Sequence, residues 1–158
     1  MTIILISLFF WFQTVDPLLD IGYEQYEKGE FTEAVKSFSR AIEMDPKNAE
    51  AHFLRAMTYQ GLALSKRAIA DLEKAIVLKI DYSEAFQQLG YIYLVSQAPA
   101  LAIEAFDKAI LITPEVAELY INRGSAQCML GNREQATRDY QKAQEMDINY
   151  AKYMNCNS

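Results

Sequence analysis

The chain has 158 residues, of which 51% are hydrophobic and 23% charged, a balance typical of one folded domain and not of a disordered segment. Its formal net charge is -6, and no run of lysine or arginine offsets that charge, so nucleic acid is not expected as a partner. Two cysteines and one histidine are fewer than the four side chains of a Cys/His zinc site, so no metal is expected either.

The first 15 residues, MTIILISLFFWFQTV, form an apolar segment unlike the rest of the chain. The apolar run is shorter than the ~20 residues of a helix that spans a bilayer. A secretory signal has a basic start, whereas the first basic residue here is Lys28. We predict that residues 1–15 attach the protein to a membrane or to a membrane complex, on a side that the sequence does not indicate. The side chains expected to make this attachment are Ile3, Ile4, Leu5, Ile6, Leu8, Phe9, Phe10, Trp11 and Phe12.

Other interpretations of residues 1–15 stay open. The segment could be a helix buried in a partner complex, or it could bind to the protein's own groove. It could also be the cleaved signal of a secreted or periplasmic protein, in which case the mature chain would start near Thr14–Pro17.

A repeated stretch dominates the remaining sequence. AIEMDPKNAEA starts at residue 41, and related stretches start at residues 75, 109 and 143, so each start lies equally far from the one before it. A fixed period of about 34 residues indicates a stacked repeat array. Small residues recur at one position of the repeat and large apolar residues at another, which is typical of closely packed helix pairs. The small residues are Gly22, Ala56, Gly90 and Gly124, and the large ones are Phe38, Leu72, Phe106 and Tyr140.

Each repeat is predicted to be a helix, a short turn and a second helix. In the stretch from Glu33 to Met44 the apolar residues follow the i, i+3, i+4, i+7 pattern of an amphipathic helix. The Asp45-Pro46 and Thr113-Pro114 pairs are expected to end second helices, because proline disfavours helical geometry in the residue before it. Gly29 and Gly131 mark turns inside repeats, and Pro99 suits the first position of a second helix. No strand pattern appears in the sequence.

The order of a small residue, tyrosine, alanine, an aromatic residue, alanine and proline resembles the tetratricopeptide repeat (TPR) family over about residues 15–150. The third repeat meets this pattern in full, with Gly90, Tyr93, Ala102, Phe106, Ala109 and Pro114. Elsewhere Gln25 and Gln127 replace the tyrosine, Ile80 and Ile148 replace the proline, and His52 takes an aromatic position. The resemblance implies an all-α, right-handed superhelix (solenoid) of four helix-turn-helix repeats. The expected division of the chain is the segment 1–15, repeats at 16–48, 49–82, 83–116 and 117–150, and a truncated C-terminal cap at 151–158.

The resemblance also implies a concave groove lined by one face of each first helix. The matching residues are Leu19, Tyr23, Tyr26, Phe53, Met57, Gln60, Gln87, Tyr91, Leu94, Ile121, Asn122, Ser125 and Cys128. Many co-chaperones of the family hold a C-terminal carboxylate with lysine and asparagine at such positions, but no lysine or arginine occurs here, so that mode is not expected. The groove is instead apolar with acidic neighbours, and the expected guest is an apolar or amphipathic helix or peptide of another protein. In the alternative, several of these side chains pack between neighbouring first helices.

No catalytic centre is expected. His52 could be a general base or a metal ligand, but we interpret it as a packing residue because no partner or nucleophile accompanies it in the sequence. No nucleophile elbow, P-loop or zinc-protease motif is present, so neither an enzyme nor a cofactor is predicted. The two cysteines can form a disulfide, which nothing in the sequence requires.

We therefore interpret the chain as a non-catalytic, membrane-associated scaffold with the layout of an assembly factor for a membrane protein complex. One alternative is a permanent structural subunit of such a complex. Another alternative is a secreted or periplasmic adaptor. A cytoplasmic location of the protein also stays open. The C-terminal face, which a full capping helix would cover, is expected either to be capped by the polar side of the fourth repeat or to mediate self-association.

Overall fold

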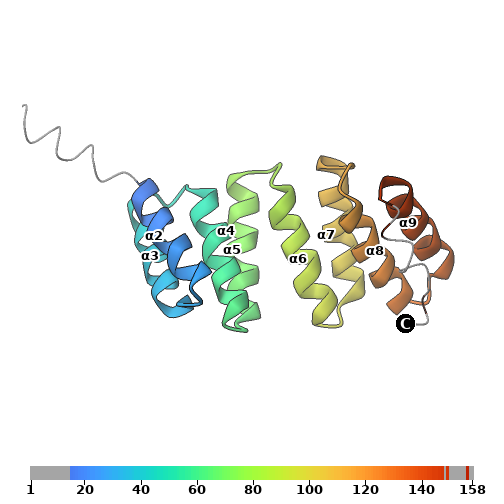
Figure 1. The fold of residues 1–158 in the computed structure, drawn as a ribbon, viewed down its shortest axis with the longest axis horizontal. Coiled ribbons are helices and arrows are strands. Elements are labelled where there is room, and N and C mark those ends of the chain that lie inside the picture. Colours follow the sequence, from blue (N-terminus) through green and yellow to red (C-terminus); the bar gives the residue numbers. More distant parts are fainter. Residues whose placement is uncertain (1–14, 148, 150–155, 157–158) are drawn as a thin grey trace, which may run out of the picture. The chain divides into compact units, whose positions relative to one another are not determined.

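The computed structural model describes residues 15–147, 149 and 156, and this part of the chain consists of helices without any strand (Figure 1). The first helices of the four hairpins are α2 (Val15–Glu27), α4 (Ala49–Gly61), α6 (Ser83–Val95) and α8 (Ala117–Met129). The second helices are α3 (Phe31–Met44), α5 (Ser65–Leu78), α7 (Pro99–Ile112) and α9 (Arg133–Met146). Every helix boundary recurs at the interval of the sequence repeat, so the period seen in the sequence is the period of the helices, and the predicted all-α fold is confirmed.

The helices form two compact units, with α2 to α5 in residues 1–78 and α6 to α9 in residues 79–158. Within each unit, every first helix packs along the second helix that follows it (Figure 1). The core of the first unit contains the buried side chains of Leu19, Ala34, Phe38, Ala41 and Ala51. In the second unit, one cluster surrounds Phe106 and Leu119, and another surrounds Tyr120 and Tyr140. These alternating small and large side chains explain why the sequence carries alanine at fixed positions of each repeat.

The recurring glycine lies against the ring of the recurring aromatic residue. A Cβ atom added to Gly22 would lie 2.5 Å from the ring of Phe38, and one added to Gly90 would lie 2.6 Å from the ring of Phe106. No real Cβ approaches a neighbour so closely, so these positions exclude any larger residue while the ring is present. In the second hairpin the large residue is Leu72, and there the small residue is Ala56. The two positions therefore vary together in size.

The helix ends match the proline and glycine signals in the sequence. Pro46 and Pro114 stand two residues after the last residues of α3 and α7, and Pro99 is the first residue of α7. Gly29 and Gly131 turn the chain inside their hairpins with φ of +76° and +78°. The sequence did not show that Ala63 and Gln97, at the equivalent positions, adopt the same left-handed geometry with φ of 56° and 57°. The turn therefore has one conformation in all four hairpins whichever residue occupies it.

Candidate functional site

In the first unit, the predicted groove residues lie on α2 and α4. Tyr23 is 52% exposed and stacks on Tyr26, with 6.5 Å between the ring centroids. Tyr26 in turn contacts Phe31 at the start of α3. Leu19 is only 9% exposed and packs in the core, so it does not contribute exposed surface for a guest. The other three residues, on α4, are half-buried: Phe53, Met57 and Gln60.

In the second unit, the corresponding residues lie on α6 and α8. Tyr91 is 50% exposed and occupies the same position of its helix as Tyr23. Ile121 is 9% exposed and packs in the core with Tyr140, whereas Gln87, Leu94, Asn122, Ser125 and Cys128 are half-buried. Among the predicted groove residues, each unit thus presents one exposed tyrosine together with partly buried side chains. We call these residues of α2 and α4, and of α6 and α8, the first-helix faces.

The first-helix faces carry no positive charge, and acidic residues begin their helices. Glu50, Glu84 and Glu118 are exposed in the first turns of α4, α6 and α8. A carboxylate in the first turn of a helix is stabilised by the positive end of the helix dipole, so these residues have a structural role whatever binds there. They also make the surroundings of the faces favourable to a cationic guest and unfavourable to an anionic one.

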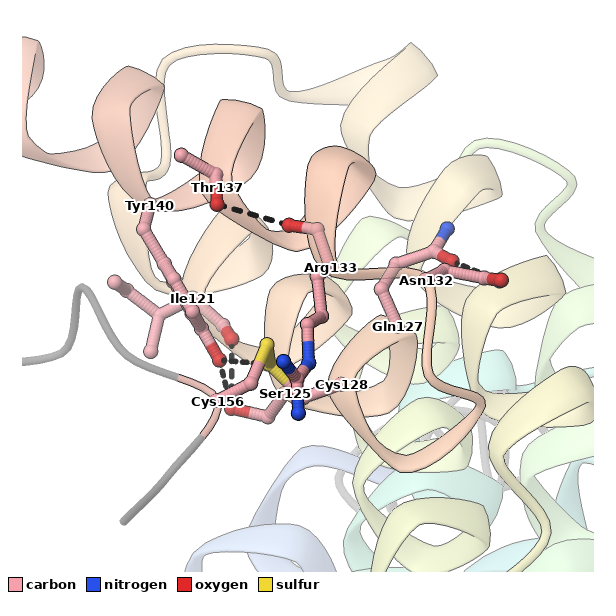
Figure 2. Close-up of a disulfide and its surroundings, with 9 residues drawn as sticks. All are labelled: Ile121, Ser125, Gln127, Cys128, Asn132, Arg133, Thr137, Tyr140 and Cys156. Carbon is pink, nitrogen blue, oxygen red and sulfur yellow. Dashed lines mark hydrogen bonds between the residues drawn. A yellow bond between two sulfur atoms is a disulfide. The ribbon is translucent and has the colours of Figure 1, made fainter.

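Cys128, at the end of the α8 face, is joined to Cys156 by a disulfide with 5.2 Å between the Cα atoms (Figure 2). The hydroxyl of Tyr140 lies 3.4 Å from Cys128 Sγ and 3.5 Å from the Ser125 hydroxyl oxygen. A disulfide sulfur has no hydrogen to donate, so the tyrosine is the donor in its contact with Cys128. The two cysteines named in the sequence are thus paired, and one residue predicted to line the groove is bonded to residue 156 instead of being a free thiol.

His52 is a buried packing residue, in agreement with the preferred interpretation of the sequence. Its Nδ1 atom lies 3.2 Å from Asp71 Oδ1, and its Nε2 atom lies 3.4 Å from the carbonyl oxygen of Pro46. Asp71, on α5, accepts two further hydrogen bonds from Arg55 on α4, at 2.7 and 2.8 Å. These hydrogen bonds raise the pKa of the Arg55 guanidinium above its usual value. The arrangement joins α4 to α5 and leaves no ring nitrogen directed at a reacting group.

A second ion pair of the same design lies in the other unit. Arg123 on α8 donates to both carboxylate oxygens of Asp139 on α9, and it also donates to Asp107 on α7. These bonds, the one to Asp139 foremost, raise the pKa of Arg123. Tyr120, at the position of His52, donates its hydroxyl to the carbonyl oxygen of Pro114, as His52 approaches Pro46. Arg123 and Asp139 occupy the positions of Arg55 and Asp71 two repeats further along the chain.

These ion pairs were not predicted from the sequence, although the repeats carry a signal for them. Comparing the chain with itself at a distance of two repeats instead of one would have matched arginine with arginine and aspartate with aspartate. Both aspartates are buried, so each ion pair joins the two helices of its hairpin in the interior and does not belong to the first-helix faces.

None of the helices in the described residues 15–147 is both long and apolar enough to cross a bilayer. Within the same residues, no three histidine, cysteine, aspartate or glutamate side chains are placed to hold a metal ion. The predicted attachment residues Ile3 to Phe12 lie outside the described part of the chain, as does most of the predicted cap at 151–158.

Comparisons with known proteins agree with this architecture. A family model described as TPR repeat matches residues 22–62, and one described as tetratricopeptide repeat matches residues 49–79 and 83–116. DnaJ homolog subfamily C member 3 of Mus musculus is 31% identical over 104 residues, which make up 66% of this chain and 21% of that protein. The chain thus spans about a fifth of the length of the curated relatives it matches.

Solved structures show the same helical arrangement over most of the chain. The crystal structure of MamA matches with a TM-score of 0.81 at 30% identity, over 88% of this chain and 81% of that one. YrrB, described as a TPR protein with an unusual peptide-binding site, matches with a TM-score of 0.77 over 87% of this chain and 71% of that one. The identity to YrrB is 20%, so that likeness concerns the fold alone.

Proposed function

Because the chain belongs to the tetratricopeptide repeat family, we propose that it is a non-catalytic scaffold that binds a helix or peptide of another protein on its first-helix faces. The observation that carries this proposal is the pair of exposed tyrosines, Tyr23 and Tyr91, at the same position of α2 and α6. Aromatic side chains with one exposed edge are the usual anchors of protein interfaces.

The chemistry of the faces defines the class of guest. Aromatic and aliphatic area on the first helices favours an apolar stripe on the guest, and the acidic residues at the helix starts favour lysine or arginine beside that stripe. An amphipathic helix with a basic polar side has both features. The absence of lysine and arginine among the predicted groove residues disfavours an acidic guest or a free C-terminal carboxylate.

We further propose that the scaffold works at a membrane, as an assembly factor for a membrane protein complex. The support for this part is the composition of residues 1–15, which is apolar and uncharged up to Phe12. Release of the protein from the membranes of its native cells should require detergent, and the intact mass should include Met1. A soluble chain shortened by about fifteen residues would replace this proposal with the secreted or periplasmic alternative.

Replacing Phe53 and Tyr91 together with alanine should abolish partner binding while the protein stays folded. The probe is a fluorescent 20-residue helical peptide of leucine and lysine, with the leucines along one face, titrated by anisotropy. We expect the affinity of each face to fall by at least about 30-fold, because each face loses one aromatic anchor and such an anchor contributes about 2 kcal/mol.

The matched control is Val77→Ala with Leu111→Ala, which also removes one large side chain from each unit. These residues lie on the second helices α5 and α7 and are 75% and 78% exposed. The control should bind the peptide as the wild type does. Equal affinity of the wild type and a folded Phe53→Ala, Tyr91→Ala protein would show that the first-helix faces are not the binding surface.

A further inference from the structure

The disulfide occupies a position that the proposed function needs. Cys128 is the last of the predicted groove residues on α8, and the equivalent positions on α2, α4 and α6 carry Tyr26, Gln60 and Leu94. Only on α8 is this position covalently joined to another part of the chain. Figure 2 shows Cys156 beside Ser125, next to the hydroxyl end of Tyr140.

Cys156 is more than a bonded neighbour of Cys128. It packs against the buried cluster formed by Tyr120, Ile121, Ala136, Tyr140 and Ala143. Ile121, Ser125 and Cys128, three of the four predicted groove residues on α8, therefore lie at or next to this cross-link. A guest helix on α8 would have to contact the area where Cys156 is held.

We propose that the Cys128–Cys156 disulfide is a redox switch that controls partner binding on the α8 face, a claim that rests on the proposed function. With the disulfide closed, Cys156 is held on the α8 face and competes with the guest for it. With the disulfide open, residue 156 is no longer tied to α8, and the face accepts the guest. The first-helix face of α2 and α4 has no cysteine and does not respond to redox conditions.

The position of the two sulfurs suits exchange with an external thiol. Both cysteines are partly exposed, so a reductant can reach them, whereas a purely structural disulfide is usually shielded in the core. The thiolate of a dithiol reductant attacks one sulfur, forms a mixed disulfide and releases the other cysteine as a thiolate. The second thiol of the reductant then forms its own disulfide and releases the first cysteine. Two electrons pass to the protein, each cysteine takes up one proton at neutral pH, and the dithiol leaves oxidised.

A switch that controls binding must obey reciprocity. If reduction strengthens guest binding by some factor, the guest must shift the equilibrium between disulfide and dithiol by the same factor. A disulfide that only stabilises the hairpin of α8 and α9 would change stability but would leave both equilibria uncoupled. This difference separates regulation from structural support.

The test uses the full chain and the leucine–lysine peptide described above. Peptide affinity is measured for the oxidised protein, for the protein reduced with dithiothreitol, and for Cys156→Ser, which removes the cross-link without altering α8. We expect the reduced protein and Cys156→Ser to bind at least about fivefold more tightly than the oxidised protein. Dithiothreitol should have no effect on Cys156→Ser. The helical signal in circular dichroism shows whether each form is folded. If Cys156→Ser does not fold, the comparison between the oxidised and the reduced wild-type protein still tests the proposal.

The reciprocal experiment titrates the ratio of oxidised to reduced dithiothreitol with and without saturating peptide, and follows the free thiols by alkylation and intact mass. The peptide should move the midpoint toward more oxidising mixtures by the same factor as the affinity change. Equal affinity of the oxidised and reduced forms, with an unmoved midpoint, overturns the switch but leaves the scaffold proposal intact. Absence of peptide binding to either form overturns the proposed function and the switch together.

Discussion

Replacing Asp71 with alanine should lower the free energy of unfolding by about 3 kcal/mol. The buried Asp71 carboxylate accepts two hydrogen bonds from Arg55 and lies 3.2 Å from the His52 ring, so its removal leaves a guanidinium without its main partner in a largely dry environment. This loss lies at the lower end of the range of about 3 to 5 kcal/mol for breaking a buried ion pair. The reason is that the Arg55 side chain is 20% exposed, so water can partly solvate the remaining charge. Urea or guanidinium unfolding followed by circular dichroism measures it.

The chain itself supplies the matched control for this prediction. In the third repeat the positions of Arg55 and Asp71 are held by Leu89 and Ala105, and both are buried without any charge. The double substitution Arg55→Leu, Asp71→Ala should therefore recover most of the lost stability, because it replaces the ion pair with a packing solution already used by this fold. A double variant no more stable than Asp71→Ala would show that apolar packing cannot replace the Arg55–Asp71 ion pair at this position.

Replacing Phe106 with alanine should cost about 3 to 5 kcal/mol of unfolding free energy. The ring is completely buried and lies against Gly90, where no side chain can move in to fill the space. Thermal and denaturant unfolding of the variant measure the loss. The effect should be confined to the second unit, so hydrogen exchange in α6 and α7 should rise more than in α2 and α3.

A compensated pair distinguishes a size match from a general loss of apolar area. Phe106→Leu should cost less than Phe106→Ala, and adding Gly90→Ala to it should restore stability, because Ala56 and Leu72 already form this combination in the second hairpin. Gly90→Ala alone should be destabilising, since its Cβ would meet the Phe106 ring. If the loss in the double variant equalled the sum of the losses in Phe106→Leu and Gly90→Ala, the two positions would not be coupled.

The success of the helix predictions has a simple physical origin. Each helix buries its own stripe of small and large apolar residues, and this stripe recurs in every repeat. The first helices end at left-handed turns, and α3 and α7 end shortly before a proline, so most of these signals are local. Gly29 and Gly131 predicted the turns in which they lie, because glycine readily adopts positive φ. Ala63 and Gln97 gave no such signal, since they do not prefer the left-handed geometry that tertiary contacts impose on them. Local chemistry therefore predicted the elements, and packing determined the remaining turns.

The features that escaped prediction depend on contacts between distant residues. Arg55 looks like an exposed surface residue on α4 until Asp71, 16 residues later, is brought opposite it on α5. The disulfide joins Cys128 to Cys156, which lies outside the four repeats, so the repeat pattern gives no signal for this pairing. Leu19 and Ile121 were predicted on the groove face, and their burial shows that part of this face also closes the core, in line with the packing alternative.

Photo-crosslinking of the full chain in its native cells tests most directly whether the first-helix faces bind the partner protein. A benzophenone amino acid is placed at position 53 or 91 on the first helices, and at position 77 or 111 on the second helices as matched exposed controls. We expect discrete adducts with a partner protein from positions 53 and 91 and none from positions 77 and 111. Adducts from the second helices, with none from the first, would contradict it and would place the interaction surface on the opposite set of helices.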